Sequence, residues 1–452
     1  MKKINFLMGS SAIILGLGLC LSLMTSCEGP EGLAGKDGAD GADGQDANET
    51  CKKCHSPSVV DAVSVQFELS KHSYGEAAFA EAGSTTCGPC HLSEAYRYVS
   101  KNNTPATFTF NATTNRWVND YYVAANAAYG EISCFTCHSS LHSTYDSTDF
   151  SPLTNTAAVS MTMWKGTKTI NLTQNNGTSN LCVKCHQPRP FTSGTSSSLK
   201  GDVINYAALV SNQTAVFYDS TAGVTTNVLV PAYRTHTHYG TVGAIYAGVG
   251  GIEFPGSVTY SNSPHALVAA CQDCHMAPMT GAAGGHTFNV KGNFNGCNVT
   301  GCHSTSPITA TSAKFTTPRN ATKALLNTLA GKLKQDGIDI LNRNGDSDHN
   351  LWIGLTANNY DGYLNVFDPI TNPEGATYNS ASFRNPNPGS SWSAAQKATN
   401  LTFPKLTLKN VQMGALINFQ LSLREYSLGI HNTAYSNALL QNTIDALTAA
   451  GF

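Results

Sequence analysis

The sequence is poor in charged side chains. Only 12% of its 452 residues are Asp, Glu, Lys or Arg, whereas about a quarter is usual for soluble domains. The 27 basic residues are balanced by 29 acidic ones, which leaves a formal charge of −2 and no basic face. This composition argues against nucleic acid as a partner. Asn, Thr, Ser, Gly and Ala take the place of the charged residues, which favours a chain with many loops.

Spare cysteines are also lacking, because 12 of the 14 cysteines belong to one repeated motif. A Cys-x-x-Cys-His pentapeptide occurs five times, and a sixth copy has four residues between its cysteines. Motifs 1 to 6, in chain order, contain Cys51 and Cys54, Cys87 and Cys90, Cys134 and Cys137, Cys182 and Cys185, Cys271 and Cys274, and Cys297 and Cys302. The histidines that end them are His55, His91, His138, His186, His275 and His303. The two cysteines outside the motifs, Cys20 and Cys27, lie near the N-terminus.

This spacing is typical of covalent haem attachment. Two thiols add to the vinyl groups of one haem as thioethers, and the next histidine reaches the iron. Zinc sites also use Cys-x-x-Cys but need no histidine directly after each second cysteine, and disulfides leave the six histidines unexplained. The Cys-Gly-Pro-Cys of motif 2 matches a thioredoxin dithiol, yet it ends in His91 as the other motifs end in histidine. We therefore predict six haem c groups, each with a proximal histidine on its iron.

With these motifs the sequence resembles the multihaem c-type cytochromes of bacterial respiratory chains. The resemblance implies export, because c-type haem is attached on the outer side of the cytoplasmic membrane. Motif 6 departs from the usual two-residue gap, although longer gaps occur in that family. No motif ends in Lys, the proximal ligand that marks the catalytic haem of typical cytochrome c nitrite reductases. Short gaps between successive motifs favour haems that neighbour one another in chain order.

Eight histidines outside the motifs are available for the second axial position, so all six irons can have two histidine ligands. The candidate distal ligands are His72, His142, His236, His238, His265, His286 and His431. His349 lies in a polar Asp-Ser-Asp-His-Asn segment, where we expect solvent exposure. His236 and His238 alternate as they would on one face of a strand, but one of them can equally be a surface residue.

Three of these candidates have an informative context. His265 stands six residues before motif 5, and His286 lies in a Gly-Gly-His-Thr-Phe segment. Both contexts resemble ligand segments of multihaem cytochromes. His142 follows His138 by four residues, so both rings would share one face of a helix. His142 should therefore serve a haem other than that of motif 3.

The N-terminus has the form of an export signal. Two lysines precede an apolar run over residues 4–23, which is the pattern of a secretory signal peptide. The segment Leu-Met-Thr-Ser-Cys that ends at Cys27 resembles a bacterial lipobox. The resemblance implies that residues 1–26 are removed and that Cys27 carries the lipid anchor. A membrane anchor helix and a plain secreted protein remain the alternatives.

Residues 27–49 form the predicted anchor and spacer. Gly29–Asp46 is six Gly-X-Y triplets in strict register with a single proline, which is a collagen-like pattern. Aspartates at every third position over most of this run would repel one another across three chains. We interpret the run as an acidic, extended spacer of about 55 Å, with a collagen-type trimer as the alternative.

The body divides into a hexahaem region, residues 50–305, and a haemless region, residues 306–452. Leucines at helical spacing predict a helix over Thr322–Leu333, and apolar positions predict a long helical stretch over Val411–Leu447. The second stretch resembles the C-terminal helices of the nitrite reductase and hydroxylamine oxidoreductase superfamily, which implies that His431 is a distal ligand. The alternative is a packing helix with an incidental histidine. The predicted fold class is mainly α with long irregular loops, few short strands and a core of stacked haems.

Two functions follow from these features. The first is electron transfer by a lipid-tethered relay in the periplasm, at the outer membrane or at the cell surface, which would pass electrons to a redox partner protein or an extracellular acceptor. Such a relay could also stack into filaments of identical subunits. The second is a reductase of nitrite, hydroxylamine or a sulfur oxyanion with one open haem. His236 or His238, with Tyr239 and Arg234 near them in sequence, would then face the substrate. We favour the relay, without excluding an enzyme.

Overall fold

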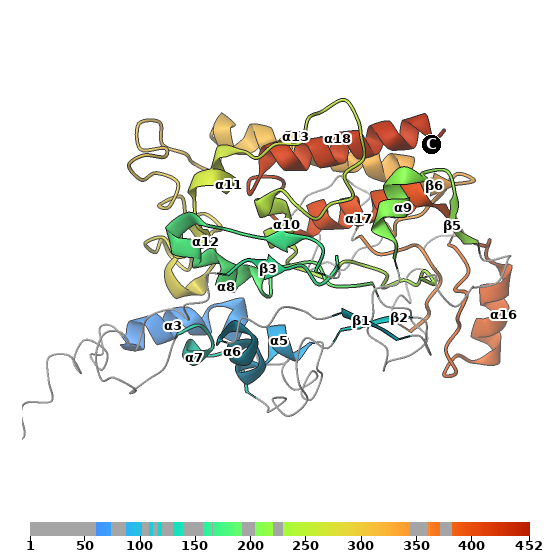
Figure 1. Cartoon of the computed structure of the whole chain (residues 1–452), viewed down its shortest axis with the longest axis horizontal. Helices are drawn as coiled ribbons and strands as arrows, with labels where there is room; N and C mark the ends of the chain where they lie inside the picture. The colour runs from blue at the N-terminus through green and yellow to red at the C-terminus, as the bar shows by residue number, and fades with distance from the viewer. Residues whose placement is uncertain are drawn as a thin grey trace, which may run out of the picture. The chain divides into compact units, whose positions relative to one another are not determined.

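The computed structural model is mainly helical with a few short two-stranded sheets, which confirms this part of the predicted fold class (Figure 1). The predicted core of stacked haems stays a prediction. It describes residues 60–73, 87–101, 108–111, 116–119, 130–138, 157–164, 166–191, 204–219, 229–343, 360, 362–370 and 382–452. The signal peptide, Cys27, the spacer, motif 1, His142 and His349 lie outside the described residues. Within the described ranges, no helix is long and apolar enough to cross a membrane.

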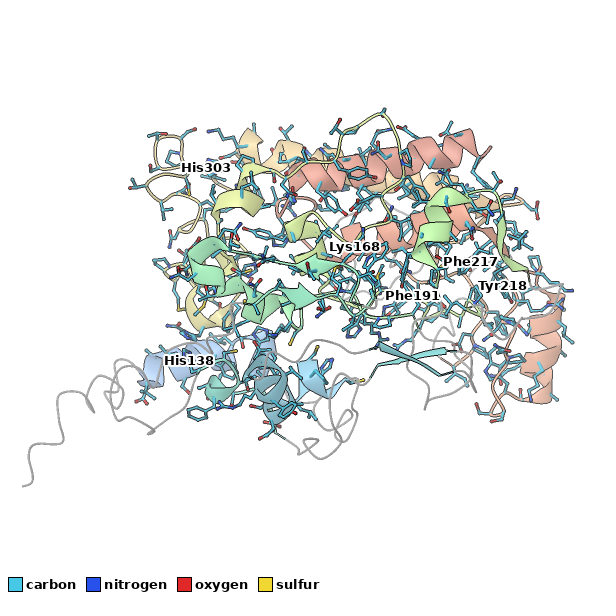
Figure 2. All side chains as sticks on the ribbon, in the orientation of Figure 1. His138, Lys168, Phe191, Phe217, Tyr218 and His303 are labelled. Carbon is cyan, nitrogen blue, oxygen red and sulfur yellow. The ribbon has the colours of Figure 1, made fainter. Side chains whose placement is uncertain are left out.

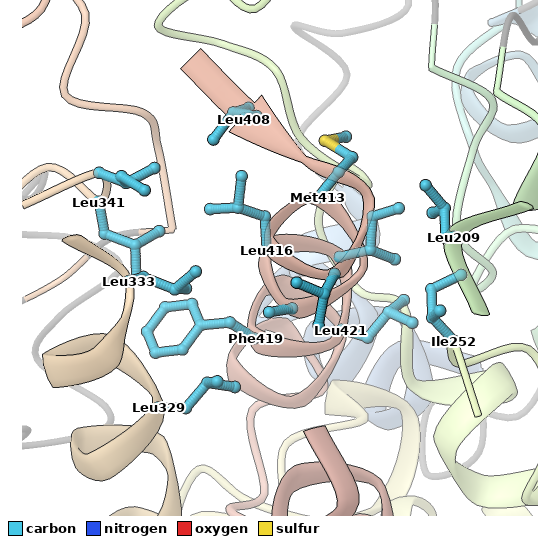
Figure 3. Close-up of a cluster of buried hydrophobic side chains, with 14 of the residues drawn as sticks. Leu209, Ile252, Leu329, Leu333, Leu341, Leu408, Met413, Leu416, Phe419 and Leu421 are labelled. Atoms are coloured by element: carbon cyan, nitrogen blue, oxygen red, sulfur yellow. The ribbon is translucent and has the colours of Figure 1, made fainter. Parts of the chain in front are cut away.

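Three long helices form the C-terminal part of the fold. They are α13 (Ala313–Lys332), α17 (Asn410–Arg424) and α18 (Thr433–Ala449), and each packs against the other two. Every residue of α17 is buried, as expected for a helix that is apolar around most of its surface. Phe419 of α17 lies beside Leu329 and Leu333 at the end of α13 (Figure 3). The core of the described structure is therefore centred on α17.

Polar side chains of α17 tie the middle of the chain to this core. The Asn418 amide both donates to the Ile252 carbonyl and accepts from the Ile252 N–H, at 2.8 Å each. Gln420 donates to the Thr235 carbonyl at 2.9 Å and accepts from the Thr237 N–H at 3.2 Å. Because buried amides need such partners, α17 fixes the position of the segment that carries His236 and His238.

The predicted helical stretch over Val411–Leu447 is wrong in one respect, because it is two helices. The chain leaves α17 at Arg424 and enters α18 at Thr433. Between them Tyr426, Leu428 and Gly429 have φ values of 62°, 56° and 84°, which is left-handed backbone that no continuous helix contains. His431 thus lies in a turn and not within a helix.

The remaining elements are short. The helices are α3 (Ala62–Glu68), α5 (Gly88–His91), α6 (Ser93–Lys101), α7 (Cys134–Cys137), α8 (Ser179–Val183), α9 (Tyr206–Ser211), α10 (Val242–Ala247), α11 (Pro264–Val268), α12 (Cys271–His275) and α16 (Ala394–Thr402). The 3₁₀ helices are η2 (Lys71–Ser73), η5 (Gln174–Gly177) and η6 (Gly285–Thr287). The antiparallel strand pairs are β1 (Phe108–Asn111) with β2 (Arg116–Asn119), β3 (Val159–Ser160) with β4 (Thr169–Ile170), β5 (Val216–Asp219) with β8 (Thr407–Lys409), and β6 (Lys334–Gln335) with β7 (Ile338–Asp339).

Candidate functional site

Motifs 2 to 5 each contain a helical turn. α5, α7, α8 and α12 carry all or part of motifs 2 to 5. In motifs 2, 3 and 4 the final histidine N–H donates to the carbonyl of the first cysteine at 3.0 Å. Because residues at i, i+3 and i+4 share one face of a helix, both thiols and the imidazole point the same way. Motif 6 keeps the same closing bond, from the His303 N–H to the Cys297 carbonyl at 3.0 Å, despite its two extra residues.

The five motif histidines that the structure describes each face one histidine from outside the motifs. The pairs are His72 with His186 (ring centroids 6.0 Å apart), His91 with His238 (6.1 Å), His138 with His286 (6.3 Å), His265 with His303 (6.1 Å) and His275 with His431 (6.2 Å). No partner is shared between two motifs. Figure 2 shows His138 at the end of α7 and His303 beyond α12, so the pairs are distributed over the described fold.

The separation within each pair fits one metal ion between two imidazoles. A transition metal binds an imidazole nitrogen at about 2.0–2.1 Å, and that nitrogen lies about 1 Å from the ring centre, so opposed rings have centroids about 6 Å apart. The interplanar angles vary from 14° to 80° among the five pairs, whereas the distances span only 6.0–6.3 Å. A metal ion held by both rings would give this combination, because it would fix the distance and leave the rings free to rotate.

The ring nitrogens on the outer side of several pairs are held by the protein. His275 Nδ1 is 2.8 Å from the Phe288 carbonyl oxygen, and His265 Nδ1 is 3.0 Å from the Ile430 carbonyl oxygen. His431 Nδ1 is 2.5 Å from a carboxylate oxygen of Glu425. Such a bond places the proton on Nδ1 and leaves Nε2 for a metal.

Burial keeps these imidazoles in the neutral form that binds metals. It lowers the pKa of His186 to about 4, with a smaller contribution from the charge of His72. Burial, together with the charge of Arg189, lowers the pKa of His238 to about 3. The pKa of His275 is also lowered, chiefly by burial. A neutral imidazole has the lone pair that coordination requires.

Two distal histidines are positioned by the turn between α17 and α18. His431 lies on it, and the neighbouring Ile430 carbonyl meets His265 Nδ1. Asn432 Oδ1 accepts from the Ser263 N–H at 2.9 Å, two residues before His265. The haemless region therefore holds one of the predicted distal ligands, His431, and orients another, His265.

Two further candidate distal histidines, His72 and His286, are placed by the segment that contains α3. Gln66 of α3 accepts from the His286 N–H at 3.0 Å, and His72 follows α3 in η2. The ring of Phe288 lies between them, with centroids 4.9 Å from His72 and 5.9 Å from His286. Residues far apart in sequence thus meet around Phe288.

His236 is the one described candidate that faces no motif histidine. It is only 6% exposed, and its Nδ1 accepts from the His238 N–H at 2.9 Å and from the Arg424 guanidinium. Burial and the charge of Arg424 lower its pKa, so it accepts as a neutral ring. The Arg424 guanidinium carbon lies 4.7 Å from the Tyr239 ring centre and 4.9 Å from that of Tyr363.

The strand geometry expected at His236 and His238 is wrong. No strand forms at residues 231–241, and His236 is not exposed. His238 has φ of 81°, a left-handed conformation that costs an L-residue about 1–2 kcal/mol. This backbone, held by Gln420 of α17, turns His238 toward His91 while His236 turns toward Arg424.

Thiol contacts show which motifs are neighbours in space. Cys90 of motif 2 contacts Cys185 of motif 4, and Cys182 of motif 4 contacts Cys271 of motif 5. The third contact, between motifs 5 and 6, joins Cys274 with Cys297. These contacts join the motifs in the order 2–4–5–6, and Cys137 of motif 3 also lies near Cys182 and Cys185 of motif 4. Motif 2 lies against motif 4, which differs from the expected chain order because tertiary packing brings α5 to α8.

Sequence reasoning missed Arg424 and Glu425. Both are 2% exposed and lie where the chain leaves α17. The available signal was two adjacent charges inside an apolar stretch of a chain with few charges, since buried charges need partners.

Comparison with known proteins identifies one family. The family model described as cytochrome c552 matches residues 35–327, a range that contains all six motifs. No curated protein and no solved structure matches the chain. His431 and Glu425 lie beyond the matched range.

Proposed function

Because the chain belongs to the cytochrome c552 family of multihaem c-type cytochromes, we propose that its histidine pairs are axial ligands of haem irons in an electron-transfer protein. The observation that carries this proposal is the set of five pairs with centroids 6.0–6.3 Å apart, each joining a motif histidine to a histidine from elsewhere. When bound, haem supplies reversible one-electron chemistry. Two protein ligands leave no axial position for a substrate, so such a site exchanges electrons only.

We assign the sixth pair by elimination. Motif 1 ends in His55, and His142 is the one predicted distal ligand that lies outside the described residues. Pairing His55 with His142 gives six haem c groups and leaves His236 and His349 as non-ligands. This assignment agrees with the expectation that His142 serves a haem other than that of motif 3.

The chain itself provides the route between these sites. The thiol contacts join motifs 2, 4, 5 and 6. A thiol that contacts the thiol of the next motif brings the edges of the two attached macrocycles together. The protein's part is therefore to fix the order of the sites and to hold histidines such as His186 where desolvation lowers the pKa and keeps the ring neutral.

Export and tethering complete the proposal. Cytochromes of this class are exported, and we propose lipidation at Cys27, with residues 27–49 as the spacer. The partner would be a redox protein or an extracellular acceptor. None of the five described pairs needs a histidine from a second chain, so filament formation, if it is a property of this protein, rests on surfaces and not on shared ligands for those five sites.

A reductase is the second candidate, and the family match supports it better than it supports the relay, because the family is of nitrite reductase type. The specific observation is the cluster of Arg424, His236, Tyr239 and Tyr363 beside the pair of His91 and His238. It places cationic and N–H donor groups next to a distal ligand whose backbone is left-handed. An oxyanion is the substrate class that such groups would hold.

Low-temperature EPR of the fully oxidised protein, with haem per chain quantified, separates the two candidates. Six haems that are all low-spin support the relay. A high-spin component that shifts on addition of nitrite or hydroxylamine supports the reductase and overturns closed ligation at one site. Arg424→Lys then tests the cluster, because it should weaken that shift. Arg384→Lys is the control: the Arg384 guanidinium donates to the carbonyls of Phe403 and Leu401 among its described partners, so this variant should leave the shift unchanged.

A further inference from the structure

One of the proposed axial histidines, His431, has a different Nδ1 partner from two others, His265 and His275. The Nδ1 atoms of His265 and His275 face backbone carbonyl oxygens. His431 Nδ1 instead faces the Glu425 carboxylate at 2.5 Å. A carboxylate is a stronger acceptor than an amide carbonyl and carries a full negative charge. The ring of His431 is therefore more strongly polarised than the other two.

The carboxylate is built rigidly into the fold. The Glu425 side chain is 0% exposed and directly follows the buried helix α17. Its Oε1 accepts from the Gly429 N–H at 2.8 Å, and its Oε2 accepts from the Ser427 hydroxyl at 2.6 Å as well as from His431. Three donors on one buried carboxylate fix its orientation, so its contact with His431 does not depend on a mobile side chain.

The contact between Glu425 and His431 shifts the reduction potential of the site in one direction. A carboxylate that accepts the Nδ1 proton makes the imidazole a better electron donor at Nε2, which favours the oxidised iron. A buried negative charge close to the iron acts in the same direction, because it stabilises the more positive oxidation state. Both effects lower the reduction potential of the site formed by His275 and His431.

We infer that Glu425 is a positioning residue that lowers the reduction potential of the haem held by His275 and His431, an inference that rests on the proposed axial pairing of these histidines. One electron is exchanged with a neighbouring site, no bond forms or breaks, and the Nδ1 proton stays between His431 and Glu425. Motif 5 contacts motifs 4 and 6, so the lowered potential falls in the interior of the described route. Glu425, which lies beyond the matched range of the family, thereby controls the energy of an electron within the haem region.

Glu425→Gln tests the inference by spectroelectrochemical titration of the holoprotein at fixed pH. The variant removes the charge and leaves a weaker acceptor of similar shape. The reduction potential of one haem should rise by at least about 59 mV, which is a tenfold change in its one-electron equilibrium constant. The reduction potentials of the other haems should not change. Asp445→Asn is the matched control, since it removes the same charge from an acid that contacts only Ser257 and Gln441 among its described hydrogen-bond partners. Equal shifts in both variants would overturn the inference.

A second variant decides the case if Glu425→Gln fails to assemble. Ser427→Ala removes the hydroxyl that donates to the same carboxylate oxygen as His431. His431 Nδ1 is then the remaining described donor to Oε2, while the Gly429 N–H still donates to Oε1, so the potential of the same haem should fall. No change, or a rise, contradicts the role assigned to Glu425.

His431→Ala separates failure of this inference from failure of the axial pairing. It should convert one low-spin haem into a high-spin haem in the EPR spectrum. If all haems stay low-spin, the pairing itself is wrong. If one becomes high-spin while neither Glu425→Gln nor Ser427→Ala moves a potential, the pairing stands and the role of Glu425 is wrong.

Discussion

The turn between α17 and α18 can be disrupted at a single glycine. Gly429 has φ of 84°, and a Cβ added there would lie 2.4 Å from the Thr322 hydroxyl oxygen of α13. Its N–H also donates to Glu425. Gly429→Ala should therefore destabilise the packing of α13 against this turn and, with it, the position of His431.

The expected loss has two parts. Left-handed backbone costs an L-residue about 1–2 kcal/mol. A methyl group forced into a filled site costs about 1–3 kcal/mol, and Thr322 is 0% exposed, so it has little room to move. Together they predict a loss of about 2–5 kcal/mol in the free energy of unfolding.

Urea denaturation of the holoprotein, followed by far-UV circular dichroism, measures this loss, and EPR shows whether the haem of His431 stays low-spin. Gly331→Ala is the control, because Gly331 lies in α13 with nothing within 4 Å of an added Cβ. It should leave stability unchanged or raise it by up to about 1 kcal/mol. In a double-mutant cycle, Thr322→Ala should remove the steric contribution to the loss in the free energy of unfolding and leave the contribution of the left-handed backbone. A coupling energy near zero would refute the steric argument.

Three further outcomes are expected. His286→Ala should produce one high-spin haem by EPR and His236→Ala none, because only His286 faces a motif histidine; the opposite pattern would reverse the two assignments. Phe419→Ala should cost about 3–5 kcal/mol in urea denaturation, because the ring is 0% exposed at the centre of the core; a loss below 1 kcal/mol would contradict that placement. Cys27→Ala should move the protein from the membrane fraction to the soluble fraction, and retention at the membrane would argue for an anchor helix.

The haem motifs could be predicted from the sequence because their geometry is local. Two cysteines and a histidine at positions i, i+3 and i+4 share a helical face wherever the turn forms. Even motif 6, with its longer gap, closes with the same bond between His303 and Cys297. The mainly helical class was predictable for a related reason, since apolar spacing over Thr322–Leu333 and Val411–Leu447 depends on neighbouring residues alone.

The histidine pairs were not predictable, because each joins segments that only the tertiary fold brings together. His265, near motif 5 in sequence, faces His303 of motif 6, and His72, before motif 2, faces His186 of motif 4. The alternation of His236 and His238 could not decide between them either. The left-handed backbone at His238, next to the Thr237 N–H that donates to Gln420 of α17, turns His238 and not His236 toward a motif histidine.

The sequence by itself determined the predicted sites of haem attachment, since the covalent chemistry needs only a local spacing of thiols and imidazole. Tertiary structure decided which histidine opposes each attachment site and which motifs are neighbours. It also decided that Glu425, one residue of an apparently continuous helix, reaches His431 across a turn. The physical reason is that axial pairing and outer hydrogen bonds depend on positions in space to within about an ångström, which local periodicity does not specify.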